Sequence, residues 1–123
     1  MVYQNNDRWG FDVGIKFIAY QRKRTALLGL TRHLYGRHSK GGWEEMKTFF
    51  KNTCVKCENR RGYIKIEKDH IIPIHDGGTD LINNLQPLCA KCNCSKTNDK
   101  TDYRELYCER HGLIMPDKWR AKP

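Results

Sequence analysis

The chain has 123 residues, of which 38% are hydrophobic, so one compact domain with flanking helices fits and two full domains are excluded. Its formal charge of +9 indicates a polyanionic partner, and the absence of any run of about 18 apolar residues excludes a membrane-spanning helix. The first 14 residues lack the pattern of a signal peptide, so we expect a cytoplasmic protein whose six cysteines bind metal and do not form disulfides.

The basic excess is concentrated in residues 1–53, which hold ten Lys or Arg against four Asp or Glu. Apolar residues before position 35 recur at roughly helical spacing, with interruptions at Gly29 and Gly36. We therefore expect a partly helical basic arm over residues 1–42, built from one or two short helices. The alternative is a solvated basic face without a ligand. Five residues of the arm are predicted to contact a nucleic-acid backbone: Arg22, Lys23, Arg24, Arg32 and Arg37.

Residues 39–42 have the composition of a linker, and residues 43–51 then have the pattern of a helix with one apolar stripe. Such a stripe normally packs into the core of a small domain, and a direct functional role is not expected for it. The stripe consists of Trp43, Met46, Phe49 and Phe50.

The remainder of the chain predicts short strands and helices. Alternating residues at 63–68 indicate one strand, and the short apolar run at 85–88 indicates a second. Short helices are expected over 89–98 and over 101–110, the second stopped by Gly112. The predicted fold is a small α+β domain over 43–100, followed by a C-terminal helix and tail over 101–123.

Four cysteines form two pairs at the spacing of zinc knuckles: Cys54 and Cys57, then Cys89 and Cys92. Four thiolates satisfy Zn²⁺ tetrahedrally and leave no open position, which is typical of a structural site. The pairs are 31 residues apart, longer than in an ordinary four-cysteine ribbon, so a further element is inserted between them. Cys94 lies close to the second pair, where it is an alternate ligand or, as we expect, a small packing residue.

The insert carries an ordered set of polar residues. It begins with Asp69-His70-Ile-Ile-Pro, continues through Gly77-Gly78, and reaches Asn84-Leu-Gln-Pro-Leu-Cys. The second knuckle is then followed by Asn93 and, three residues later, by Lys96. Taken singly, each of these residues is more often an ordinary turn, cap or surface residue. Their order and their interleaving with the zinc cysteines point to a site.

This set resembles the HNH endonuclease family, whose pattern runs D-H-I-x-P, G-G, N-L-x-x-L-C-x-x-C, then N or H, and x-x-K. The resemblance covers residues 43–100 and is greatest to the short form common in bacteriophages; the basic arm lies outside it. It implies a ββα-metal core, also called a His-Me finger, stapled by the four-cysteine zinc site. The family allows Asn at the position of Asn93.

The resemblance also implies roles for the individual residues. His70 would be the general base, and Asp69 and Asn93 would hold one catalytic Mg²⁺ or Mn²⁺, which prefer hard oxygen ligands. Asn84 would brace the loop and help to orient His70, and Lys96 would hold a phosphate as a point charge. The other histidines are expected to be exposed and without a role: His33, His38, His75 and His111.

We therefore predict an enzyme that hydrolyses phosphodiester bonds in double-stranded DNA, by nicking or by double-strand cleavage. The main alternative is a non-catalytic zinc module that binds nucleic acid or a protein. An RNA-directed nuclease ranks lower because the chain has no aromatic-rich platform for single strands. A role in phage DNA processing follows from the resemblance alone, and a homodimer or phage packaging proteins are the expected protein partners.

Overall fold

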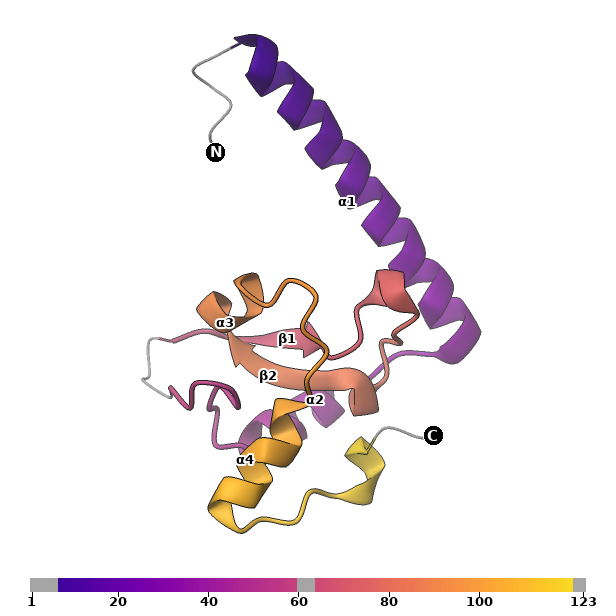
Figure 1. The fold of residues 1–123 in the computed structure, drawn as a ribbon. Coiled ribbons are helices and arrows are strands. Elements are labelled where there is room, and N and C mark those ends of the chain that lie inside the picture. The colour runs from indigo at the N-terminus through magenta and orange to yellow at the C-terminus, as the bar shows by residue number, and fades with distance from the viewer. Residues whose placement is uncertain (1–6, 60–63, 121–123) are drawn as a thin grey trace.

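The fold is that of a computed structural model, which describes residues 7–59 and 64–120. Figure 1 shows a compact α+β unit and one long helix, α1, that projects away from it. The predicted α+β class is correct. No helix within the described residues is long and apolar enough to cross a membrane.

Helix α1 spans Asp7–Tyr35 without a break, so the predicted interruption at Gly29 is wrong. One glycine costs a helix only about 1 kcal/mol, and its neighbours here are the strong helix formers Leu28 and Leu30. Gly36 does end the helix, because its φ of 91° is costly for residues with a side chain. Of the predicted arm, residues 1–6 lie outside the described part of the chain.

Helix α2 spans Lys40–Phe49, so it begins within the predicted linker. The cause is a cap: the Ser39 hydroxyl accepts a hydrogen bond from the Gly42 backbone N–H at 2.9 Å. The predicted apolar stripe is confirmed, since Trp43, Met46 and Phe50 are buried and Phe49 packs against them.

The sheet has two antiparallel strands, β1 (Ile66–His70) and β2 (Leu85–Cys89), joined by a loop that contains the short 3₁₀ helices η2 (Ile74–Asp76) and η3 (Ile82–Asn84). The register places Asp69 opposite Gln86 and His70 opposite Leu85. The first strand begins later than its predicted position at 63–68, and Tyr63 lies outside the described residues. Because β1 extends to His70, both Asp69 and His70 belong to the strand itself.

The helices that follow the sheet are shorter than predicted. Helix α3 spans only Ala90–Cys94, and α4 spans Tyr103–His111 and ends at Gly112, whose φ is 64°. A final 3₁₀ helix, η4, covers Asp117–Trp119. Figure 1 shows α3 on one side of the sheet, with α2 and α4 on the other.

The core lies between the sheet and the helices α2, α4 and η4. Phe50 contacts Tyr107 edge to face, with ring centroids 5.3 Å apart, and Trp119 is packed against Phe50. Arg104 is also fully buried; it donates one hydrogen bond to the carbonyl of Leu85 and pairs with Asp102. This core lies beneath the sheet and fixes the strand that carries part of the functional site.

Candidate active site and metal centre

The four predicted zinc cysteines come together. The sulfur atoms of Cys54, Cys57, Cys89 and Cys92 all lie within 4.8 Å of one another, and those of Cys57 and Cys89 are 3.8 Å apart. A tetrahedral zinc with Zn–S bonds of about 2.3 Å separates its sulfurs by about 3.8 Å, so the cluster has the size of a structural zinc site. Two sulfurs come from the turn after α2, and the other two from the end of β2 and from α3.

The electrostatics of the cluster favour a cation at its centre. Burial raises the pKa of the Cys54 thiol, but hydrogen bonds from the backbone of Cys57, Cys89 and Lys56 lower it more in sum, so the net shift is downward. Burial and the neighbouring sulfurs raise the pKa of Cys92 instead. Several thiolates in one small volume repel one another, and a divalent cation removes that repulsion.

The two remaining cysteines lie outside this cluster. Cys94 is exposed, so the expectation that it is a packing residue is wrong: α3 turns its side chain to solvent. Cys108 is buried in the core on α4, where burial raises the pKa of its thiol.

Asp69 is a buried carboxylate in the middle of the site. Its Oδ2 atom accepts a hydrogen bond from Gln86 Nε2 at 2.9 Å and one from Lys96 Nζ at 2.7 Å. Both bonds use the same oxygen and fix the carboxylate in one orientation. Sequence reasoning missed Gln86, although it lies directly across the sheet from Asp69.

Lys96 is only 7% exposed, and its ammonium group donates to three oxygens. Besides Asp69, the acceptors are the carbonyls of His70 at 2.8 Å and of Ile71 at 3.1 Å. An ammonium group has three donors, so none is left for a phosphate. The geometry therefore gives Lys96 a different role from the predicted binding of a phosphate. Its ammonium group holds the turn after β1 and the Asp69 carboxylate.

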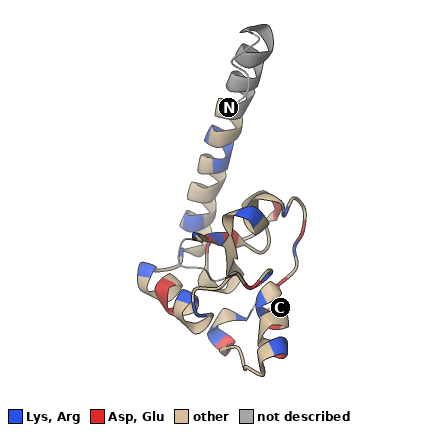
Figure 2. Cartoon of the chain, turned by 90° about the vertical axis from the view of Figure 1, so that its left-hand side faces the viewer, with Lys and Arg blue, Asp and Glu red and all other residues tan. Residues whose placement is uncertain are grey.

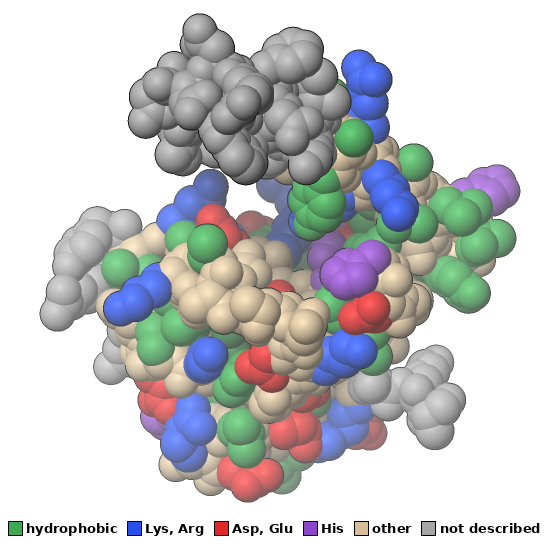
Figure 3. Space-filling view, turned by 45° about the horizontal axis from the view of Figure 1, so that its top comes forward, with side chains coloured by type: hydrophobic (Ala, Val, Ile, Leu, Met, Phe, Trp, Pro, Cys, Tyr) green, Lys and Arg blue, Asp and Glu red, His purple; other side chains and the backbone are tan. Residues whose placement is uncertain are grey.

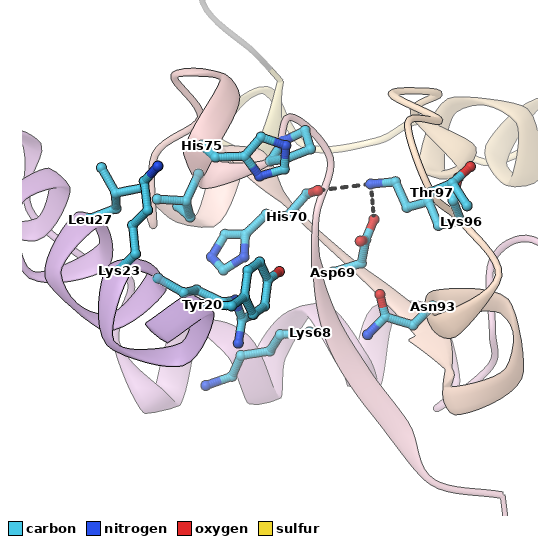
Figure 4. Close-up of a pocket in the computed structure, with 13 residues that line it drawn as sticks. Tyr20, Lys23, Leu27, Lys68, Asp69, His70, His75, Asn93, Lys96 and Thr97 are labelled. Carbon is cyan, nitrogen blue, oxygen red and sulfur yellow. Dashed lines mark hydrogen bonds and ion pairs between the residues drawn. The ribbon is translucent and has the colours of Figure 1, made fainter. Parts of the chain in front are cut away.

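Asn93, on α3, lies beside Asp69. Its amide nitrogen donates to Glu67 Oε1 at 2.9 Å, which fixes the amide. Figure 4 shows the amide oxygen of Asn93 pointing toward Asp69. The carboxylate and the amide oxygen thus offer two hard oxygen ligands at one place, a donor set that fits Mg²⁺ or Mn²⁺.

Asn84 braces the loop between the strands. Its side chain accepts from the Ile72 backbone N–H at 3.0 Å and donates to the carbonyls of Ile72 and Thr79. Gly78 is explained by this brace, because a Cβ at that position would lie 1.8 Å from the carbonyl oxygen of Ile72, whereas Gly77 adopts a φ of 91°. This loop fixes the direction of the chain just after His70.

His70 contacts an acidic residue that sequence reasoning missed. Its Nε2 atom lies 2.8 Å from Oδ1 of Asp80, which is 2% exposed. The other carboxylate oxygen, Oδ2, accepts a hydrogen bond from Arg32 Nε at 2.8 Å, and Arg32 comes from α1. The sequence around Asp80 does not distinguish it from Asp76 in the same loop. Asp76, however, lies at the surface and pairs with Lys100.

His38 joins the same cluster, so the expectation that it is exposed is wrong. Its Nδ1 atom lies 3.0 Å from the backbone oxygen of Asp80, and its own backbone N–H donates to that oxygen at 2.8 Å. Residue 37 also forms an isolated parallel β-bridge with residue 80. These contacts attach the C-terminal end of α1 to the loop beside the site.

A cleft of about 460 Å³ opens at Asp69, His70 and Asn93. Its opposite wall is α1, which contributes Tyr20, Lys23, Arg24 and Leu27. Figure 4 shows side chains from α1 and β1 facing each other across this space, and the space-filling view in Figure 3 shows a hollow between the helix and the compact unit.

The predicted basic contacts are divided by the structure. Lys23 and Arg24 line the cleft, and Lys68 of β1 adds another cation to the lining, besides Lys96, which is paired with Asp69. Arg32 is held by Asp80, while Arg22 and Arg37 are exposed and do not line this cleft. Figure 2 marks the Lys and Arg positions in blue on the ribbon, spaced along the described part of α1. His75 is exposed, as predicted, and lies at the cleft rim.

Comparison with known proteins gives one family. Residues 54–99 match the family model described as HNH endonuclease. The matched segment contains all four clustered cysteines together with Asp69, His70, Asn84 and Asn93; it ends before α4 and excludes α1. No curated protein and no solved structure matches the chain.

Proposed function

We propose that this chain, whose residues 54–99 carry an HNH endonuclease domain, is a metal-dependent enzyme that hydrolyses phosphodiester bonds in double-stranded DNA. One observation carries the proposal: Asp69, His70 and Asn93 line a single cleft whose facing wall is basic. A non-catalytic zinc module has no use for a carboxylate, an imidazole and an amide oxygen gathered opposite Lys23 and Arg24. The resemblance to short phage enzymes favours phage DNA processing as the setting.

Asp69 and Asn93 are the residues that would hold the catalytic cation. Both are held by neighbours that leave an oxygen available: Asp69 by Gln86 and Lys96 through one carboxylate oxygen, and Asn93 by Glu67 through its nitrogen. A divalent cation bound there would supply positive charge to offset the phosphate and the developing charge on the leaving oxygen. In this assignment Lys96 positions Asp69 and does not bind a phosphate.

His70 is the proposed general base. A neutral imidazole accepts a proton from water through its unprotonated ring nitrogen, and a positioned base of this kind contributes about 10²- to 10⁴-fold to a rate. His70 follows Asp69 directly at the end of β1 and is followed by the turn that Asn84 braces. The base and the proposed cation ligand therefore share one rigid strand.

A plasmid-nicking assay tests the proposal. Protein that retains its structural zinc but has no other divalent cation should leave supercoiled plasmid intact, and added Mg²⁺ or Mn²⁺ should give nicked or linear product. The circular dichroism spectrum should be the same before and after the addition, because the catalytic cation is not part of the fold. DNA that binds the protein but stays uncut with both cations would favour the non-catalytic module.

A second prediction concerns the basic residues of α1 that line the cleft. Replacing Lys23 and Arg24 by alanine should weaken DNA binding and lower the slope of log K against log salt by about 0.9 for each phosphate that is no longer neutralised. The matched control is the double variant Arg22→Ala with Arg37→Ala, which removes the same charge from two exposed positions that do not line the cleft. Fluorescence anisotropy over a salt series gives the slope. An equal slope change in both proteins would mean that the cleft wall has no special place in binding.

A further inference from the structure

We propose that Asp80 is a positioning residue that selects the tautomer of His70, so that Nε2 carries the proton and Nδ1 is left to accept one from water. The inference rests on the proposed function, because it assigns the base of that same site. Its starting observation is that the two carboxylate oxygens of Asp80 contact residues of two different elements. Oδ1 contacts His70 of β1, and Oδ2 contacts Arg32 of α1.

The chemistry of the partners decides which atom carries the proton. Arg32 is a donor only, so the oxygen facing it must accept. Burial raises the pKa of Asp80, but the hydrogen bonds from His70 and Arg32 and the nearby charges lower it more, and the net shift is downward. Asp80 is thus an ionised acceptor at both oxygens. Neutral His70 then has to place its single N–H on Nε2, which leaves a lone pair on Nδ1.

The surroundings of Asp80 hold it in this arrangement. Arg32 approaches from α1, His38 from the segment before α2, and His70 from β1. His38 Nδ1 lies 3.5 Å from Oδ2 and 3.0 Å from the backbone oxygen of Asp80, so it too faces acceptor atoms. Three groups from three segments of the chain thus hold the buried carboxylate, and among the described residues Asp80 is the acidic side chain that pairs with His70.

From these contacts we predict that the Asp80→Asn substitution changes the tautomer of His70. An asparagine amide has one acceptor and one donor end, and Arg32 requires the acceptor end to face it. The amide nitrogen would then face His70 and donate to Nε2. That bond moves the imidazole proton to Nδ1 and removes the free lone pair from the atom that needs it. Asp80→Ala imposes no tautomer, so the imidazole keeps access to both forms.

We therefore expect the conservative substitution Asp80→Asn to reduce activity more than the truncation Asp80→Ala, which is the reverse of the usual order. We expect Asp80→Asn to lower kcat by about 10²- to 10⁴-fold, as for loss of a positioned base, and Asp80→Ala by only about 10- to 100-fold, with KM little changed in both. A merely structural role for Asp80 predicts the opposite, because the isosteric amide disturbs packing less than a truncation. Asp80→Ala equal to or worse than Asp80→Asn in kcat, with both proteins folded, would refute the tautomer assignment.

A rescue variant tests the reason for the effect. In the double variant Asp80→Asn with Arg32→Leu, no guanidinium orients the amide, which is then free to turn its oxygen to His70. Activity at saturating DNA should rise above that of Asp80→Asn alone. The single Arg32→Leu variant is the control for the loss of the α1 contact, and lack of rescue would contradict the proposed cause.

Nuclear magnetic resonance decides the point without an activity assay. The side-chain ¹⁵N shifts of His70, assigned from the spectrum of a His70→Ala variant, should show Nε2 protonated in the native protein above the imidazole titration. Asp80→Asn should show Nδ1 protonated. Native protein with the proton on Nδ1 would overturn the inference even if DNA is cut. A native protein with the expected tautomer that cuts no DNA would instead refute the proposed function.

Discussion

Replacing His70 by alanine should lower kcat for plasmid nicking by about 10²- to 10⁴-fold, while the fold and the zinc content stay unchanged. The reason is that His70 lines the cleft and lies next to Asp69, the proposed cation ligand, at the end of β1. DNA binding should be nearly unaffected, because the binding wall belongs to α1. A time course of supercoiled plasmid at saturating protein, with Mg²⁺ present, measures the effect.

The matched control for this experiment is His75→Ala. His75 lines the same cleft, but its side chain is 61% exposed, and its ring pairs with Asp76 at 3.7 Å. We expect a change of a few-fold at most. If His70→Ala cut as well as the unaltered protein while His75→Ala failed to cut, the general base would have to be reassigned to the rim of the cleft.

The second large effect concerns the cysteine cluster. Replacing Cys89 by serine should unfold the compact unit, because metal binding contributes about 10–16 kcal/mol in small zinc domains and a whole domain is stable by only about 5–15 kcal/mol. Cys89 ends β2 and Cys92 lies on α3, so the cation would connect the sheet to the helix that carries Asn93. Thermal melting by circular dichroism, together with the zinc content, measures the loss.

Cys94→Ser is the matched control, because it makes the same chemical change on α3 at an exposed cysteine outside the cluster. Its melting temperature and its zinc content should equal those of the unaltered protein. A Cys89→Ser protein that melted at the native temperature would show that the core around Phe50 and Trp119 is sufficient without the cation. The proposed catalytic cation should have no such effect on melting.

The features predicted correctly are those that depend on the spacing of residues close together in the sequence. The two cysteine pairs each lie within one turn of chain, so the four-cysteine cluster could be predicted from the sequence. The apolar stripe of α2 is also local, since its residues repeat with the helical period. The fold class followed from these elements.

The features that were missed depend on contacts between distant residues. Arg32 and Asp80 are 48 positions apart, and nothing near either residue indicates the other. Lys96 was predicted at a position that the family pattern marks, but the sequence does not show that its ammonium group turns inward to Asp69. A motif gives the identity of a residue, whereas its role is fixed by which way the folded backbone turns its side chain.

The length of α1 has a consequence for how a duplex would be covered. Its 29 residues at about 1.5 Å each make a rod of roughly 44 Å, and B-DNA rises about 3.4 Å per base pair. The rod leaves the compact unit in one direction only. A duplex lying along it would be shielded for up to about a dozen base pairs on one flank of the scissile bond and far less on the other. The footprint of the protein would then be lopsided, and its long flank would reveal which way round the protein sits on DNA.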